Sequence, residues 1–315
     1  MREFQQPPGH PAADQYVEQQ GDYAESVDWG SQEWGTHRYH IRQLLEHAMD
    51  RLPVKEKVAV FGAGNHGDVD LPELAGHFSQ VTVLDTEANS IEEVLTQSGA
   101  GASARVKSLT TVDYTCLDQI QFYETWEEML LNRTPAAEMA SYLKDCAFAV
   151  RKYEALPHLK KSFQLVVSSS VHTQLFYIHA LSQFAGYAGQ YEEQDVRLII
   201  DALSFMRNNL ILDYNRLLLS LLKPEGKLVM WSDMIRMDEA NEELLEQLYG
   251  LQSESERIGY LFRAFGQYGI EAAVNGLKDL YEQMKQEGLL FKSWVWIPGK
   301  ERKYIVAGIS GSPVQ

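Results

Sequence analysis

The sequence is poor in cysteine and has no long apolar run, and each scarcity excludes a class of protein. Its two cysteines, Cys116 and Cys146, have no metal-ligand spacing and form no disulfide framework. We expect ordinary thiols in a reducing cytoplasm and no bound metal. No stretch is long enough to span a bilayer, and the polar, Pro/Gln-rich start does not resemble a signal peptide. A cytoplasmic protein with no membrane partner is therefore expected.

Positive charge is also scarce. The chain has 28 Lys and Arg against 44 Asp and Glu, which gives a net charge of −16. Nucleic acid is bound by basic surfaces that neutralise phosphates, so no nucleic-acid partner is expected. With 315 residues, 45% of them hydrophobic, the chain suits one large α/β domain with additions, or a domain plus a small cap.

The most informative stretch is residues 57–89, which predicts a strand, a turn, a helix and a second strand. The apolar run Lys57–Phe61 is typical of a strand buried on both faces. It leads into the glycine-rich turn 62–67 and a helix over 68–78. A second buried strand, Val81–Leu84, ends on Asp85. Such a unit offers backbone N–H groups at a helix start and a carboxylate that can accept hydrogen bonds from ribose hydroxyls.

The turn has the glycine spacing GxGxxG, which alone is compatible with NAD or with S-adenosylmethionine. Asp68 and Asp70 follow the third glycine directly and would repel a pyrophosphate. S-adenosylmethionine has no phosphate and carries a sulfonium cation, which nearby carboxylates suit. The turn could also bind nothing, but Asp85 stands where a ribose partner belongs. The pattern favours S-adenosylmethionine.

The segments VAVFGAGNHGDVDL and VTVLDTE resemble motif I and the second-strand acid of class I S-adenosylmethionine-dependent methyltransferases. The form GAGNxxDxDL is similar to a poorly characterised bacterial group of that superfamily. The resemblance covers about residues 38–310. It implies a Rossmann-like seven-stranded sheet that ends in an antiparallel hairpin, and S-adenosylmethionine as cofactor. The cofactor-binding residues expected from the resemblance and from the strand ends are Gly62, Ala63, Gly64, Asn65, Asp70, Asp85, Thr86, Asp113, Ser168 and Ser169.

Later strands supply further candidates. A third strand, Arg105–Val112, ends at Asp113, which the methyltransferase pattern places near adenine, although a lone Asp can equally cap a helix. A fourth strand, Phe163–Ser168, leads to His172 at the edge where ligands bind in doubly wound sheets. The Asp/Asn-Pro-Pro-aromatic motif of many nucleic-acid methyltransferases is absent there. This absence again argues against a nucleic-acid substrate.

Three residues are candidates for catalysis: His172, Tyr177 and Asp233. His172 could act as a general base near neutral pH, or it could be a hydrogen-bonded structural residue. Tyr177 lies one to two helical turns further on. Asp233 follows a fifth strand, Lys227–Trp231, and could face the pocket or cap a helix.

The remaining segments define the expected organisation. Residues 1–37 form a tail and an aromatic arm with Tyr23, Trp29 and Trp34, which could close over the cofactor or pin the terminus to the surface. Residues 38–315 form the methyltransferase domain, beginning with a helix over 38–52. A helical stretch over about 117–162 either shapes the substrate pocket or adds a packing layer. Near the end, a looser aromatic segment separates helices over 238–251 and 274–287. Strands over 291–297 and 303–309 follow as a hairpin.

Together these observations predict an S-adenosylmethionine-dependent methyltransferase acting on a nitrogen or oxygen atom of a small molecule. Three alternatives remain open at the level of sequence. The same fold could transfer the aminocarboxypropyl group, as nicotianamine synthases do. It could bind the cofactor without catalysis, or the chain could be an NAD-dependent oxidoreductase. The oligomeric state is not predicted.

Overall fold

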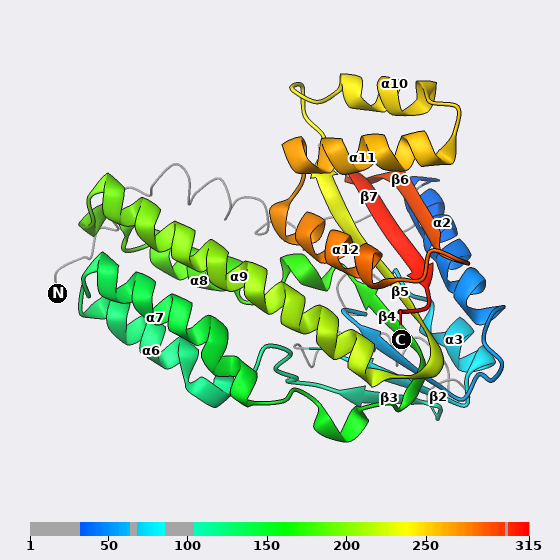
Figure 1. Ribbon diagram of the computed structural model, residues 1–315, viewed down its shortest axis with the longest axis horizontal. Helices are drawn as coiled ribbons and strands as arrows, with labels where there is room; N and C mark the ends of the chain where they lie inside the picture. The colour runs from blue at the N-terminus through cyan, green and yellow to red at the C-terminus, as the bar shows by residue number, and fades with distance from the viewer. Residues whose placement is uncertain (1–31, 64–67, 86–103, 300–301, 315) are drawn as a thin grey trace. The chain divides into compact units, whose positions relative to one another are not determined.

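The computed structural model describes residues 32–63, 68–85, 104–299 and 302–314 (Figure 1). The seven strands in this part of the chain are β1 (Lys57–Phe61), β2 (Gln80–Leu84), β3 (Val106–Leu109), β4 (Phe163–Ser169), β5 (Leu222–Arg236), β6 (Leu290–Gly299) and β7 (Arg302–Gly311). Its α-helices are α2 (Gln32–Met49), α3 (Leu71–His77), α6 (Phe122–Leu131), α7 (Ala136–Ala149), α8 (Tyr177–Ala185), α9 (Glu193–Leu221), α10 (Glu243–Gly250), α11 (Glu254–Tyr268) and α12 (Glu271–Gln283).

The strands form one sheet in the order β3-β2-β1-β4-β5-β7-β6. Strands β1 to β5 pair in parallel, whereas β7 is antiparallel to both β5 and β6. This is the Rossmann-like class I methyltransferase sheet with its terminal antiparallel hairpin, so the predicted fold is confirmed. The strand order reverses direction between β1 and β4, which is the point where ligands bind in such sheets.

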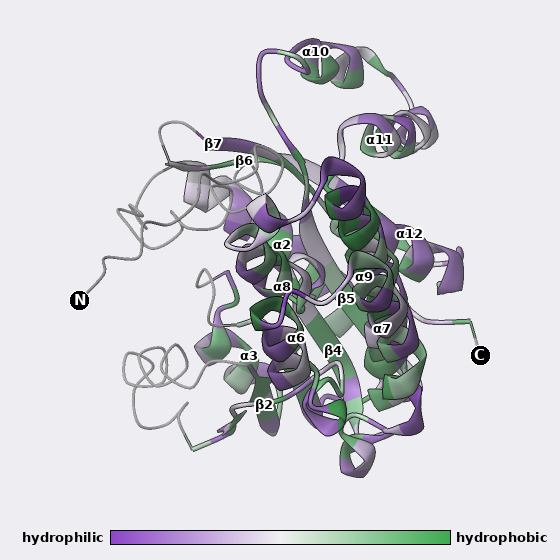
Figure 2. Cartoon of the chain, turned by 90° about the vertical axis from the view of Figure 1, so that its left-hand side faces the viewer, coloured by the Kyte–Doolittle hydropathy of each residue, from purple (hydrophilic) through white to green (hydrophobic). Residues whose placement is uncertain are grey.

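The central strands are buried on both faces, and most of their residues are apolar. All four residues that follow Lys57 in β1 are buried, and so is every residue of β4. Figure 2 shows β4 coloured as hydrophobic over much of its length. Continuous burial of this kind is expected of parallel strands covered by helices on both sides.

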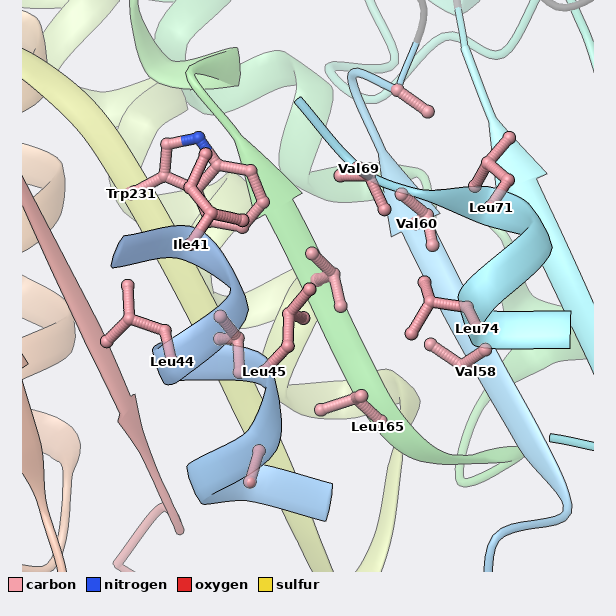
Figure 3. Close-up of a cluster of buried hydrophobic side chains, with 14 of the residues drawn as sticks. Ile41, Leu44, Leu45, Val58, Val60, Val69, Leu71, Leu74, Leu165 and Trp231 are labelled. Carbon is pink, nitrogen blue, oxygen red and sulfur yellow. The ribbon is translucent and has the colours of Figure 1, made fainter. Parts of the chain in front are cut away.

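One hydrophobic core forms where α2 and α3 cover the sheet. Figure 3 shows Ile41, Leu44 and Leu45 of α2 and Leu74 of α3 on the same side of the strands. Every second residue of β1 and β4 faces α2 and α3, and these residues, such as Val60 and Leu165, complete the core. The packing fixes α2 against the sheet and thereby places the polar residues of its first turns.

The described residues fall into two compact units. The sheet unit contains residues 32–112, 156–172 and 215–314 as far as they are described, and the helical unit contains Asp113–Ala155 and Thr173–Tyr214. The helical unit has a core of its own, which includes Trp126, Leu143 and Leu203. The helices α6 and α7 of the expected insertion belong to it. The predicted division into residues 1–37 and 38–315 stays a prediction.

Three elements differ from their predicted form. Helix α2 begins at Gln32 rather than at 38, so Trp34 lies in a helix and is buried instead of belonging to a loop. Strand β5 continues through Pro224 and Gly226, because a register shift between Phe163 and Leu165 of β4 accommodates that stretch. The aromatic segment over 254–268 is a regular helix, α11. Tyr23 and Trp29 of the expected arm lie outside the described residues.

Candidate active site

The turn after β1 is built around Gly62. Its φ of +71° is a left-handed conformation that suits glycine, and a Cβ at this position would lie 2.4 Å from the carbonyl oxygen of Ser169. Because Phe61 pairs with Ser168 in β4, Gly62 and Ser169 are the next residues along these neighbouring strands. The first glycine of the motif is therefore required by the close approach of β1 and β4.

Asp85 lies beside this turn, at the end of β2. Phe61 of β1 pairs with Leu84 of β2, so Gly62 and Asp85 are adjacent positions on parallel strands. The Asp85 residue is buried, and its backbone is held on the β3 side through its N–H to Leu109 O (3.1 Å) and its carbonyl to Val112 N (3.4 Å). The structure thus places the glycine turn and the expected ribose-binding acid next to each other. Ala63 and Ser168 are buried at the same ends of β1 and β4.

A second acid, Asp68, joins the turn to β4 and α2. Its residue is 7% exposed, and its Oδ2 accepts a hydrogen bond of 3.3 Å from the hydroxyl of Ser169. Its Oδ1 lies 3.3 Å from Nε2 of His37, which is 1% exposed. Asp68 therefore makes polar contacts with two elements that are far apart in the sequence.

The tautomer of His37 follows from its surroundings. The indole N–H of Trp294 donates to Nδ1 of His37 over 2.9 Å, so Nδ1 acts as the acceptor. A neutral imidazole then carries its proton on Nε2, the nitrogen that faces Asp68. The ring of His37 stacks on Trp296, with 4.4 Å between centroids, and meets Trp34 edge-on. Three tryptophans thus hold the ring in one orientation toward the carboxylate.

Asp233 completes this group of polar residues. It lies in β5 two residues after Trp231, so the two side chains share one face of the strand, and Trp231 packs in the core formed with α2. Burial is the main cause that raises the pKa of Asp233 to about 7, Asp68 adds to this effect, and His37 acts in the opposite direction. Its Oδ1 has no hydrogen-bond partner among the described residues.

His172 occupies a different environment. It is 2% exposed, and its Nε2 lies 2.7 Å from Oδ1 of Asn215, whose amide group donates to Gly276 O (3.0 Å) and Asp279 Oδ2 (2.8 Å). Since Asn215 donates elsewhere, its Oδ1 accepts, and His172 must carry its proton on Nε2. Burial lowers the pKa of His172 to about 4. A Cβ at Gly276 would lie 2.4 Å from the imidazole. This geometry favours the structural interpretation of His172, and its catalytic role stays a prediction.

Tyr177 and Asp113 belong to the helical unit. The hydroxyl of Tyr177 lies 3.3 Å from Ser204 Oγ, and the guanidinium of Arg207 lies 4.6 Å from the centre of its ring. The carboxylate of Asp113 accepts from Thr115 N (2.8 Å) and Asp118 N (3.0 Å), which is the arrangement of a local cap. These contacts support the capping alternative for Asp113.

Four expected cofactor residues remain, and the structure describes one of them. Asp70 is the exposed N-cap of α3, and its Oδ1 accepts from Glu73 N at 2.8 Å. Gly64, Asn65 and Thr86 lie outside the described residues.

His37 is the residue that reasoning from the sequence did not single out. The available signal was the spacing of Trp34, His37, Ile41 and Leu44, which continues the apolar face of α2 toward its start. Asp68 was noted only as a charge that repels phosphate, because nothing in the sequence pairs it with a histidine 31 positions earlier.

Metal binding and membrane insertion are the remaining points. Within the ranges that the structure covers, no group of three or more His, Cys, Asp or Glu residues is arranged to hold a metal ion. None of the helices in those ranges is both long and apolar enough to cross a membrane.

Comparison with known proteins finds distantly similar structures and no match by sequence. No family model matches the chain, and no curated protein matches it. Solved structures that resemble it include a complex between the Haloferax volcanii Trm112 methyltransferase activator and a protein described as a methyltransferase (10% identity, 92% of this chain and 100% of that chain, TM-score 0.37). Others are a precorrin 8W decarboxylase from Methanobacterium thermoautotrophicum (15%, 87% and 89%, 0.32) and an rRNA methylase from Streptococcus thermophilus (9%, 86% and 96%, 0.31). With TM-scores this low, none of these likenesses bears on what this chain does.

Proposed function

We propose that this protein is an S-adenosylmethionine-dependent methyltransferase that acts on a nitrogen or oxygen atom of a small molecule. The observation that carries the proposal is the adjacency of Gly62 and Asp85 at the ends of β1 and β2. A tight turn lets a ligand approach the backbone, and a buried carboxylate beside it can accept both ribose hydroxyls. This pair suits the nucleoside part of the cofactor.

The charges around the turn suit the sulfonium part. Asp68 and Asp233 are buried acids of the sheet unit, and Asp68 is bonded to the Ser169 hydroxyl next to the turn. A cation is stabilised near buried carboxylates, whereas the pyrophosphate of NAD would be repelled by them. When bound, S-adenosylmethionine supplies an activated methyl group. The protein then contributes binding, orientation and exclusion of water.

A small acceptor is favoured by the charge of the protein. A net charge of −16 opposes binding to a phosphate backbone. Residues 168–173, which follow β4, read SSSVHT and lack the Asp/Asn-Pro-Pro-aromatic motif of many nucleic-acid methyltransferases. The acceptor is thus proposed to be a metabolite rather than a nucleic acid.

The test is the affinity of an Asp85→Ala variant for S-adenosylmethionine, measured by calorimetry. Losing a hydrogen bond to a charged group costs about 1.5–3 kcal/mol, so we expect an affinity about 10- to 150-fold weaker. Asp201→Ala, which removes an exposed acid from the helical unit, serves as the control and should bind normally. Unchanged affinity in Asp85→Ala would show that the ribose site has been misassigned.

Product analysis then separates the reactions open to this fold. Methyl transfer leaves S-adenosylhomocysteine, and aminocarboxypropyl transfer leaves methylthioadenosine. Cofactor binding with neither product over long incubation with a broad set of amines and phenols would favour a non-catalytic role.

A further inference from the structure

Three polar side chains from distant parts of the sequence gather in the sheet unit. They are His37 from α2, Asp68 from the segment before α3 and Asp233 from β5, and we call them the acid–histidine cluster. All three are more than nine-tenths buried. Burying an ionised carboxylate is costly unless it is paired with a cation or hydrogen-bonded. Two buried acids in one cluster therefore require a physical explanation.

The cluster is joined to the proposed cofactor turn by a short chain of contacts. Gly62 approaches the carbonyl of Ser169 so closely that a Cβ would clash with it. The hydroxyl of the same serine donates to Asp68, which faces His37 Nε2 at 3.3 Å. The ends of β1, β4 and β5 meet at one edge of the sheet. Ser169 also pairs with Trp231 of β5, two residues before Asp233. A ligand bound against Gly62 would therefore lie near the cluster.

The cluster has unused capacity to accept a hydrogen bond. Asp233 Oδ1 has no hydrogen-bond partner among the described residues, although the residue is only 7% exposed. The indole N–H of Trp231, on the same face of β5, also lacks a partner within the described ranges. Buried polar atoms almost always have a hydrogen-bond partner, so these two atoms at the ligand edge of the sheet suit a polar ligand.

We propose that Asp233 binds the amine group of the methyl acceptor and accepts its proton, with His37 and Asp68 acting as positioning residues. This inference rests on the proposed function and adds the class of acceptor. An ammonium group is attracted by two buried carboxylates, whereas an acceptor carboxylate would be repelled by them. An alcohol would be too weak an acid to give its proton to a carboxylate before attack.

Methyl transfer to the amine requires that the nitrogen first lose a proton. The acceptor ammonium first gives one proton to Asp233, because a protonated nitrogen has no lone pair. The nitrogen lone pair then forms the N–C bond as the S–C bond of the sulfonium breaks, and the bonding pair stays on sulfur as a neutral thioether. The product is a methylated ammonium, and Asp233 returns the proton that it accepted to solvent once the product has left.

The electrostatics of the cluster fit this role. The charged groups that act on the pKa of Asp233 are Asp68, which raises it, and His37, which lowers it, and burial raises it most. The result, a pKa of about 7, matches the acid to proton exchange near neutral pH. His172, at the end of the neighbouring β4, is bonded to Asn215 instead.

The experiment compares two cofactor analogues in the full-length protein. S-adenosylhomocysteine has an uncharged sulfur, whereas sinefungin has a carbon in place of the sulfur and, on that carbon, a primary amine in place of the transferred methyl group. The amine of sinefungin thus reaches toward the position of the transferred methyl. At pH 8 we expect sinefungin to bind at least about 10-fold more tightly than S-adenosylhomocysteine, because its ammonium gains a hydrogen bond to a charged group.

Asp233→Asn should abolish this preference while leaving the affinity for S-adenosylhomocysteine nearly unchanged. Asp50→Asn, which removes an exposed acid after α2, is the matched control and should retain the preference. In the wild-type protein the preference for sinefungin should shrink at pH 5.5, because Asp233 is protonated there. This second measurement tests the proposal without any variant. In His37→Gln the midpoint of this pH dependence should move upward, which a purely structural role of His37 would not cause.

The outcomes separate the two proposals. Equal affinity of wild-type protein for both analogues, or a preference that survives Asp233→Asn, would overturn the acid–histidine cluster as the amine site and leave the methyltransferase proposal intact. If neither analogue binds, the proposed function itself fails.

Discussion

Two buried titratable residues of the sheet unit respond to burial in opposite directions. His172 is held neutral, with a pKa lowered to about 4, and its Nε2 is committed to Asn215. Asp233 has a pKa raised to about 7 and an oxygen without a partner among the described residues. A buried histidine whose Nε2 is hydrogen-bonded to a buried amide is typical of structural packing, whereas a buried carboxylate with a raised pKa and an unbonded oxygen is typical of a site.

His172→Ala should therefore lower stability rather than remove a base. The side chain fills space against Gly276 and bonds to Asn215. We expect a loss of about 2–4 kcal/mol at pH 7.5, measured by urea unfolding. Because the folded pKa of about 4 lies below the usual value of 6.5, the histidine contribution is fully present above pH 6.5. It is lost as pH falls toward 4, so the gap between wild type and variant should narrow there.

His158→Ala provides the control, because His158 is an exposed histidine elsewhere in the sheet unit, and it should unfold like the wild type. A His172→Ala protein of normal stability that binds the cofactor but has lost turnover would restore the catalytic interpretation.

At the scale of elements, local signals decide which parts can be predicted. Strands β1, β2 and β4 are rich in Val, Leu and Phe, and the Pro298-Gly299 turn signal predicts the hairpin of β6 and β7. Helix α11 was missed because only three of its residues, Leu261, Ala264 and Phe265, are buried, while the other aromatic side chains lie at least partly exposed and obscure the period. Its signal is at the start, where Ser253 and Glu256 form a capping box.

Ser253→Ala should destabilise α11. The hydroxyl of Ser253 accepts from Glu256 N at 3.2 Å, and the carboxylate of Glu256 accepts from Ser253 N at the same distance. Removing an N-cap hydroxyl costs about 0.5–2 kcal/mol. Hydrogen exchange should detect this as faster exchange of the amides in the first turns of the helix. Ser255→Ala, two residues on and equally exposed, should leave that exchange unchanged or slower.

The candidate site shows where prediction from the sequence ends. Gly62 and Asp85 could be predicted because one short β-turn-α-β unit contains both. The partnership of His37, Asp68 and Asp233 could not, because it depends on how α2 packs on the sheet and on which face of β5 points toward that helix. Contacts across such sequence distances leave no local periodicity to detect.

At the scale of the whole molecule, the cofactor that the protein binds can be recognised by the ligand that stabilises its folded state. A ligand that binds only the folded state adds stability by mass action, about 2.7 kcal/mol at a concentration 100 times its Kd. The acids Asp68 and Asp85 at the turn suit a sulfonium or thioether nucleoside and oppose a dinucleotide. We expect S-adenosylhomocysteine at saturating concentration to raise Tm by several degrees, and NAD at the same concentration to leave it unchanged.

Differential scanning fluorimetry checks this directly. Adenosine and ATP serve as controls, because they separate recognition of the nucleoside from tolerance of phosphates: adenosine should give a small rise and ATP none. The acids predict this order, since each added phosphate brings negative charge toward the buried carboxylates of Asp68 and Asp85. A rise with NAD and none with S-adenosylhomocysteine would reverse the assignment and favour an oxidoreductase on this sheet.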